Sequence, residues 1–289
     1  MNNIRTDYPK ISLMITSYNR QKILGKSLKY ILKAQMIDNC NIVIVQQNIN
    51  LEFKKIFNKI NHKNFYLIKT SYPNYFDPHK KMILNGRTGL EFCFEKLNSD
   101  MCFYLEDDIA ISYDFISFCS FILNKYKNDK NFFAVNSFSK EKFNYSKVNL
   151  YSKFIYGIGK GWGVNKNRWP IIKKMWSNKF IHSHSAPLFE SPIEEYVKKK
   201  RLFVVMPVNS RSFEIPSNGV NINLKNDANY FKDFKRSFVR RKYDNLNYSY
   251  TFFSNYKWRK DCIKYKGKLI HFFSDLIYNF FKNIYSLTR

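Results

Sequence analysis

The sequence has few cysteines, few acidic residues and no long apolar run. None of its five cysteines is paired at the spacing of a metal finger or a Cys-x-x-Cys motif, which indicates buried, reduced thiols. No apolar stretch is long enough to span a bilayer. The first residues contain no apolar core of a signal peptide. These absences predict a cytoplasmic protein without a membrane-spanning segment.

Acidic residues are strongly outnumbered, because 22 Asp and Glu stand against 49 Lys and Arg, and the formal net charge is +27. Such an excess favours an anionic partner, which could be a nucleotide, an acidic polymer, a nucleic acid or a membrane surface. The 289 residues suffice for one large α/β domain with an appendage, and a hydrophobic fraction of 45% can fill its core.

Three of the acids gather in one place. Met101 begins a run of five apolar or aromatic residues that leads directly into Glu106, Asp107 and Asp108. A short apolar run of this kind is typical of a buried strand. Ligands of open α/β sheets bind at the carboxyl ends of strands, so the acids indicate a site for a cation or for a ligand with hydrogen-bond donors. The alternative is an acidic surface turn before a helix capped by Ser112.

Strand and helix patterns alternate through the first half of the chain. The expected strands cover residues 11–15, 41–45, 65–68 and 101–105, and the expected helices cover residues 22–36, 51–60 and 85–97. Later strands are expected at residues 132–135, 153–156 and 202–206, and later helices at residues 168–176 and from Ser191–Pro192 onward. This alternation predicts an α/β fold with a mostly parallel, doubly wound sheet.

Two shorter segments each allow two interpretations. Residues 157–163 combine four glycines with Lys160 and Trp162 but lack the ending of a phosphate-binding P-loop. They fit either backbone close to a ligand beside an aromatic platform, or a tight turn with a core tryptophan. His182 and His184 fit either a metal-chelating pair or a solvent-facing loop.

The character of the chain changes near residue 226. Residues 226–289 are rich in Lys, Arg and aromatic side chains, and the last part has the apolar spacing of an amphipathic helix. The pattern favours a helix in an anionic membrane interface, and the alternative is a helix packed on its own domain. We therefore divide the chain into an α/β domain, residues 1–225, and a basic amphipathic tail, residues 226–289.

Several motifs together resemble a known enzyme family. The segment 16–20, Thr-Ser-Tyr-Asn-Arg, resembles family 2 glycosyltransferases. The segments 103–115, 161–169, 193–196 and 207–220 resemble, in order and rough spacing, family 13, the β-1,2-N-acetylglucosaminyltransferase I type. The resemblance covers about residues 10–222 and implies the glycosyltransferase A fold, which is Rossmann-like with a mostly parallel central sheet.

The resemblance assigns roles to individual residues. Asp108 would ligate Mn²⁺ or Mg²⁺, which holds the diphosphate of the donor. Asp107 and Glu106 would contact the ribose and the sugar. Arg20 would lie beside the nucleotide, and Thr16 and Tyr18 of the same segment would also be donor-binding, as would Arg87 and Trp162 at other matching positions.

Two of the matching positions depart from the family pattern. Gln47 stands where the family has an Asp that reads uracil, and an amide can also pair with the uracil imide. Glu194 matches the catalytic Asp that removes the proton from the acceptor hydroxyl, and the adjacent Glu195 is the alternative base.

The expected function is a metal-dependent, inverting glycosyltransferase. It would move a sugar, with N-acetylglucosamine as one candidate, from a UDP-sugar to a hydroxyl of a bacterial surface glycan such as a capsule or lipooligosaccharide. It would act in the cytoplasm, bound peripherally to the inner membrane, on a glycan or glycolipid acceptor, without a nucleic-acid partner. One alternative is a nucleic-acid-binding protein that uses the basic tail, and another is a retaining enzyme of the same fold.

Overall fold

The computed structural model describes residues 9–47, 49–139, 149–155, 157–177, 191–215 and 249–250. Eleven strands of these residues form a nine-stranded sheet and a two-stranded sheet. The strands of the large sheet are β1 (Ile11–Ser17), β2 (Cys40–Gln46), β3 (Phe65–Lys69), β4 (Met101–Glu106), β6 (Phe132–Asn136), β7 (Leu150–Phe154), β8 (Trp162–Asn165), β9 (Phe203–Pro207) and β11 (Ser249–Tyr250). The small sheet pairs β5 (Ile109–Ile111) with β10 (Ser212–Glu214).

The large sheet has the order β11-β7-β9-β6-β8-β4-β1-β2-β3. Strands β4, β1, β2 and β3 are parallel neighbours, as are β6 with β9 and β7 with β11. Only β8 against β4 and β6, and β7 against β9, are antiparallel within this sheet. The predicted α/β class with a mostly parallel central sheet is therefore confirmed.

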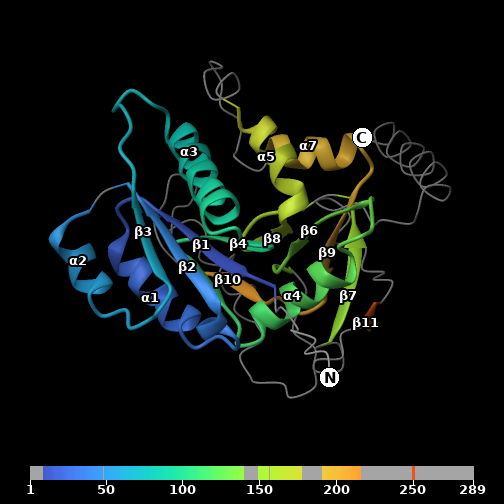
Figure 1. The fold of residues 1–289 in the computed structure, drawn as a ribbon, viewed down its shortest axis with the longest axis horizontal. Coiled ribbons are helices and arrows are strands. Elements are labelled where there is room, and N and C mark those ends of the chain that lie inside the picture. Colours follow the sequence, from blue (N-terminus) through green and yellow to red (C-terminus); the bar gives the residue numbers. More distant parts are fainter. Residues whose placement is uncertain are drawn as a thin grey trace, which may run out of the picture.

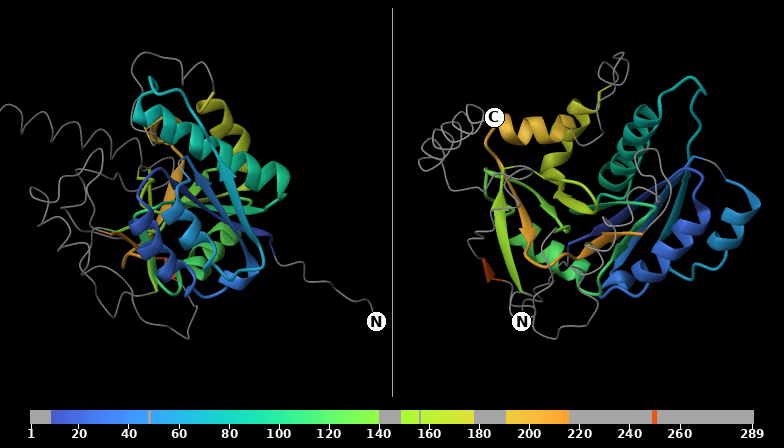
Figure 2. Two further views of the ribbon diagram at one scale, coloured as in Figure 1. Left: turned by 90° about the vertical axis from the view of Figure 1, so that its left-hand side faces the viewer. Right: turned by 180° about the vertical axis from the view of Figure 1, so that it is seen from behind.

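Helices cover both faces of the large sheet. They are α1 (Gln21–Ile31), α2 (Leu51–Phe57), α3 (Pro78–Glu91), α4 (Phe115–Lys125), α5 (Trp169–Met175) and α7 (Ser191–Lys199), with short 3₁₀ turns at Ile37–Asn39 and Lys166–Arg168. In Figure 1, α3, α5 and α7 lie above the sheet, and the core residues assign α1, α2 and α4 to its other face. The view from behind shows the same division, with teal α3, yellow α5 and orange α7 on one side (Figure 2).

The strands separate two apolar cores because successive side chains of a strand point to opposite faces. In β1, Leu13 and Ile15 join the core that contains α1, α2 and α4. Met14, which lies between them, joins the core that contains α3, α5 and α7. The continuous apolar run of β4 has the same cause, since both of its faces are covered. Four cysteines, Cys40, Cys93, Cys102 and Cys119, are buried free thiols, as expected.

Two expected helix starts are wrong. The helix expected at residues 85–97 begins earlier, at Pro78, because the Asp77 side chain accepts a hydrogen bond from the backbone N–H of His79 at 2.8 Å and caps it. It ends at Glu91 and continues as a π-helical turn, Phe92–Lys96. Helix α4 begins after Asp114, so Ser112 is not its cap.

Gly89 allows α3 to pack closely on the sheet. A Cβ at this position would lie 2.0 Å from Met14 Sδ and 2.8 Å from Val45 Cγ2. We therefore expect Gly89→Ala to lower the free energy of unfolding by about 1–3 kcal/mol through overpacking, measured by urea denaturation. The matched control is Gly25→Ala in α1, whose Cβ would meet Ile56 Cδ1 at an ordinary 3.4 Å. This control should raise stability slightly through helix propensity, and equal losses in both variants would contradict the packing argument.

Three predictions fall outside the described residues. They concern the His182 and His184 pair, the boundary near residue 225, and the amphipathic helix of the tail. Within residues 226–289 the structure describes only β11. Within the described residues, none of the helices combines the length and apolarity that crossing a bilayer requires.

Candidate functional site

The two segments that the sequence singled out meet at one edge of the sheet. Strands β1 and β4 are parallel neighbours with Thr16 opposite Glu106, so residues 16–20 and 106–108 follow adjacent strand ends. Glu106 is half-buried, whereas Asp107 and Asp108 are 1% and 5% exposed. The acids thus do not form a surface turn, and they need partners inside the protein.

Arg20 provides the main partner of the acid pair. Its Nη1 donates to Asp108 Oδ2 at 2.8 Å, and its Nη2 donates to Asp107 Oδ1. The Ser17 hydroxyl donates to the other carboxylate oxygen of Asp107 at 2.9 Å. A guanidinium that reaches two carboxylates fixes both in place and neutralises part of their charge. The predicted site therefore contains its own cation.

The electrostatics of this cluster follow from its burial. Burial raises the pKa of Asp107 to about 6, against the lowering effect of Arg20 and with a further increase from Asp108. Burial alone would lower the pKa of Arg20, but the two aspartates outweigh it and raise that pKa above its ordinary value. Arg20 therefore remains charged while Asp107 is easily protonated.

A second ion pair adjoins the first through the small sheet. Glu214 of β10 lies opposite Ile109 of β5, and the next residue, Ile215, donates its backbone N–H to the Asp108 carbonyl at 2.6 Å. Lys160 Nζ lies 3.0 Å from Glu214 Oε2. Burial raises the pKa of Glu214; Lys160 opposes this shift and Asp108 adds to it. The site is thus a cluster of carboxylates with two built-in cations.

Ser17 and Glu214 are site residues that the sequence did not predict individually, and Lys160 stood out only as part of the glycine-rich run. Ser17 lies inside the segment 16–20, so the resemblance could have included it. Glu214 lies inside the segment 207–220, but β10 is only three residues long, too short for a periodic pattern that would have indicated a strand.

Trp162 lies in the core rather than on an open surface. It is fully buried, and its ring stacks on Tyr104 with centroids 5.4 Å apart and planes inclined by 20°. Tyr104 in turn shares a hydrogen bond of 3.2 Å with the Thr16 hydroxyl. This is the arrangement that the core-tryptophan interpretation predicts. Trp162 and Thr16 therefore shape the sheet edge but offer no open face to a ligand.

The two base candidates differ in their surroundings. Glu194 on α7 is half-buried, and its Oε1 accepts a hydrogen bond from the backbone N–H of Ile158 at 3.4 Å. Glu195 is exposed. The structure thus places Glu194 against the glycine-rich loop. Arg87 on α3 donates to the Trp176 carbonyl at 3.1 Å, on the same side of the sheet as α7.

The carboxyl end of β2 completes this edge of the sheet. Gln47 is nearly buried and donates its backbone N–H to the Ser17 carbonyl at 3.2 Å. The side-chain amide of Gln46 donates to the Tyr18 carbonyl. Tyr18 is 45% exposed, so it is accessible to a ligand that stacks on its ring.

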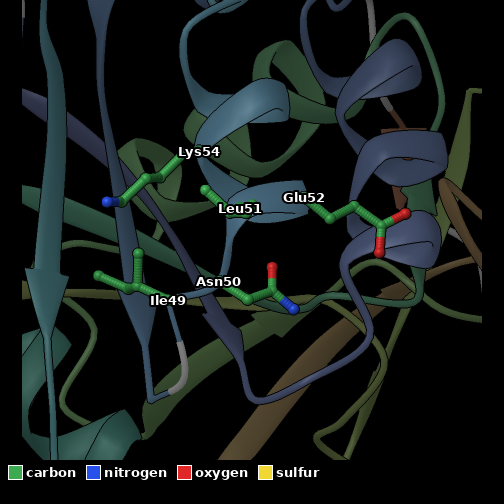
Figure 3. A pocket seen from close by; sticks show the side chains of 5 residues that line it. All are labelled: Ile49, Asn50, Leu51, Glu52 and Lys54. Carbon is green, nitrogen blue, oxygen red and sulfur yellow. The ribbon is translucent and has the colours of Figure 1, made fainter.

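A shallow hollow of about 500 Å³ lies just beyond this strand end (Figure 3). Its lining comes from Ile49, Asn50, Leu51, Glu52 and Lys54 at the start of α2. Its lining contains none of the clustered carboxylates, so this hollow and the charged site are different features.

A divalent metal ion fits this donor set only together with a ligand. Among the described residues, no group of three His, Cys, Asp or Glu side chains is placed to form a metal cage. Ions such as Mg²⁺ need only one or two protein carboxylates when phosphate oxygens complete their coordination. Asp108 supplies a suitable hard oxygen ligand, and Arg20 now occupies part of that carboxylate.

Comparisons with known proteins give distant structural matches. No family model and no curated protein matches the sequence. The mannosyltransferase PcManGT from Pyrobaculum calidifontis, solved with GDP-Man and Mn²⁺, aligns at a TM-score of 0.47 and 11% identity over 74% of this chain and 59% of that chain. S. aureus TarS 1–349 aligns at a TM-score of 0.48 and 12% identity, over 71% of this chain and 60% of that chain. This chain thus spans about three fifths of either structure, and because both TM-scores lie below 0.5, the case for a function depends on its own residues.

Proposed function

We propose that this chain is a glycosyltransferase of the glycosyltransferase A fold that moves a sugar from a UDP-sugar donor to a hydroxyl of a glycan or glycolipid. The observation that carries the proposal is the buried pair Asp107 and Asp108, held by Arg20 and Ser17 at the carboxyl ends of β4 and β1. A parallel sheet binds its ligands at that edge. The motif resemblance supplies the reaction type.

The nucleoside part of the donor would bind beside β2. Tyr18 offers an exposed ring for stacking on a base. Gln47 lies at the same edge, and the hollow at the start of α2 follows it directly along the chain. An amide can pair with the imide edge of uracil, which supports UDP as the nucleotide.

The diphosphate would bind over the charged cluster. Arg20 is a permanently charged donor fork and can exchange a carboxylate partner for phosphate oxygens. A divalent ion held by Asp108 would neutralise charge on the leaving diphosphate. Asp107 remains hydrogen-bonded to Ser17 and keeps Arg20 oriented during this exchange.

The acceptor hydroxyl would lose its proton to Glu194. This carboxylate is half-buried beside the glycine-rich loop, whereas the Glu195 side chain is exposed. A carboxylate that removes the proton while the hydroxyl attacks from the face opposite the diphosphate gives inversion at the anomeric carbon.

A thermal-shift screen of nucleotide sugars, each with and without Mn²⁺, tests the proposal. A donor at about 100 times its dissociation constant adds about 2.7 kcal/mol of stability, which corresponds to a rise in Tm of several degrees. We expect UDP-sugars to raise Tm more than other nucleotide sugars. Stabilisation by random oligonucleotides, with no response to any nucleotide sugar, would instead support a nucleic-acid-binding protein.

Replacing Asp108 with Ala is expected to abolish the increase in UDP affinity caused by Mn²⁺, because the hard oxygen ligand is lost. Affinity for UDP without metal should stay the same or rise, since a negative charge near the diphosphate is removed. Titration calorimetry measures both. The charge-matched control is Asp100→Ala, an exposed acid at the opposite end of β4. A Mn²⁺ effect that survives in Asp108→Ala would count against the assignment.

A further inference from the structure

Lys160 is held in an unusual backbone conformation beside the acid cluster. Its φ of 51° lies in the left-handed region, which residues with a side chain rarely adopt. Its neighbours Gly159 and Gly161, with φ of 132° and 97°, make the tight loop possible. The position of the Lys160 side chain, which forms an ion pair with Glu214, gives a reason for a non-glycine residue at this strained position.

The buried hydroxyls of two serines fix the backbone of this loop. The Ser212 hydroxyl donates to the Lys160 carbonyl, and the Ser137 hydroxyl donates to the Gly161 carbonyl at 2.7 Å. A Cβ at Gly161 would lie 2.7 Å from Ser137 Oγ, so the loop packs closely against Ser137. The ammonium group of Lys160 is thereby directed toward Glu214, which the β10–β5 pairing places next to Asp108.

The Lys160–Glu214 ion pair is suited to a change of partner, in which Lys160 leaves Glu214 and binds a ligand. The Lys160 side chain is 28% exposed, whereas Glu214 is 9% exposed, so the lysine can reach an incoming ligand while the glutamate stays. A diphosphate carries more negative charge than one carboxylate, and lysine binds phosphate as a compact point charge. Burial and the neighbouring Asp108 raise the pKa of Glu214, whereas Lys160 lowers it.

We propose that Lys160 is a donor-binding residue whose ammonium leaves Glu214 and binds the diphosphate of the nucleotide sugar. This inference rests on the proposed function and adds a second cation to the diphosphate site, in addition to Arg20. Neither the glycine-rich run nor the family resemblance assigns a role to Lys160.

Titration calorimetry on the full chain, with UDP and separately with inorganic pyrophosphate, tests the role of Lys160. Lys160→Met and Lys160→Gly should each weaken both ligands by about ten- to a hundredfold, the value of one charge-assisted hydrogen bond. Lys160→Gly removes the backbone strain that Lys160→Met retains, so its Tm should equal or exceed that of Lys160→Met. Equal losses of affinity in the two variants then cannot result from a strained loop.

The matched control is Lys166→Met, which removes the same charge beyond the opposite end of β8, where Lys166 donates its backbone N–H to the Asp100 carbonyl. Its affinities should stay within about twofold of wild type, since exposed charges at that distance are screened. Equal weakening in Lys166→Met would show a general charge effect and overturn the proposal. Glu214→Gln removes the competing carboxylate and should bind pyrophosphate more tightly.

The same calorimetry distinguishes failure of the Lys160 proposal from failure of the glycosyltransferase proposal. If the wild type binds UDP and pyrophosphate but the Lys160 variants bind them equally well, only the role of Lys160 is overturned. If the wild type binds neither ligand, with or without Mn²⁺, the glycosyltransferase proposal falls as well.

Discussion

Replacing Glu194 with Gln is expected to lower the turnover number by about 10²–10⁴-fold while donor affinity stays unchanged, because a positioned general base contributes that much to a proton transfer. The amide keeps the size of the side chain and can still accept the hydrogen bond from the Ile158 N–H that holds Glu194 against the loop. It cannot take a proton from the acceptor. Steady-state kinetics with the donor identified by the thermal-shift screen measures the effect, and calorimetry measures the binding.

Glu195→Gln is the matched control for this experiment. It removes the same charge from the adjacent position of α7, where the side chain is exposed, and its turnover should remain close to wild type. Loss of activity in Glu195→Gln alone would identify Glu195, and not Glu194, as the general base. If Glu194→Gln weakened UDP binding as strongly as it reduced turnover, Glu194 would be a binding residue rather than the base.

Much of the sheet could be predicted because its signal is local. The run from Met101 to Leu105 is apolar at every position, since helices cover both faces of β4. The β-branched run of β2 and the apolar start of β1 carry the same signal. The acids Asp107 and Asp108 were predicted to lie at the carboxyl end of such a strand, and they directly follow β4, which pairs with β1.

The partners of those acids could not be predicted, because they depend on strand order. Arg20 and Asp108 are separated by 88 positions in the sequence and meet only because β1 pairs with β4. Glu214 reaches the cluster through a strand of three residues, which is too short for a periodic pattern. The resemblance placed a metal on Asp108, and only the structure showed that Arg20 occupies the same carboxylate.

Strand order also explains an ion pair that the sequence did not predict. Arg211, in the segment 207–220, is fully buried, and its Nε lies 3.2 Å from Asp114 Oδ2. Its Nη1 donates to the Asn209 carbonyl at 2.6 Å, and the Ser112 hydroxyl donates to Asp114 at 2.7 Å. The pair ties the segment before β10 to the start of α4, and so it holds β10, with Glu214, beside the site.

Replacing Arg211 with Met is therefore expected to lower the free energy of unfolding by about 3–5 kcal/mol, because it leaves the Asp114 carboxylate buried without its cation. Urea denaturation measures the loss. The double variant Arg211→Met with Asp114→Asn should recover part of it, since the uncompensated charge is gone. Lys173→Met, which breaks an exposed ion pair with Glu91 and Glu95, should leave stability close to wild type. If Arg211→Met cost no more than Lys173→Met, the buried pair would not be what holds β10 beside Asp108.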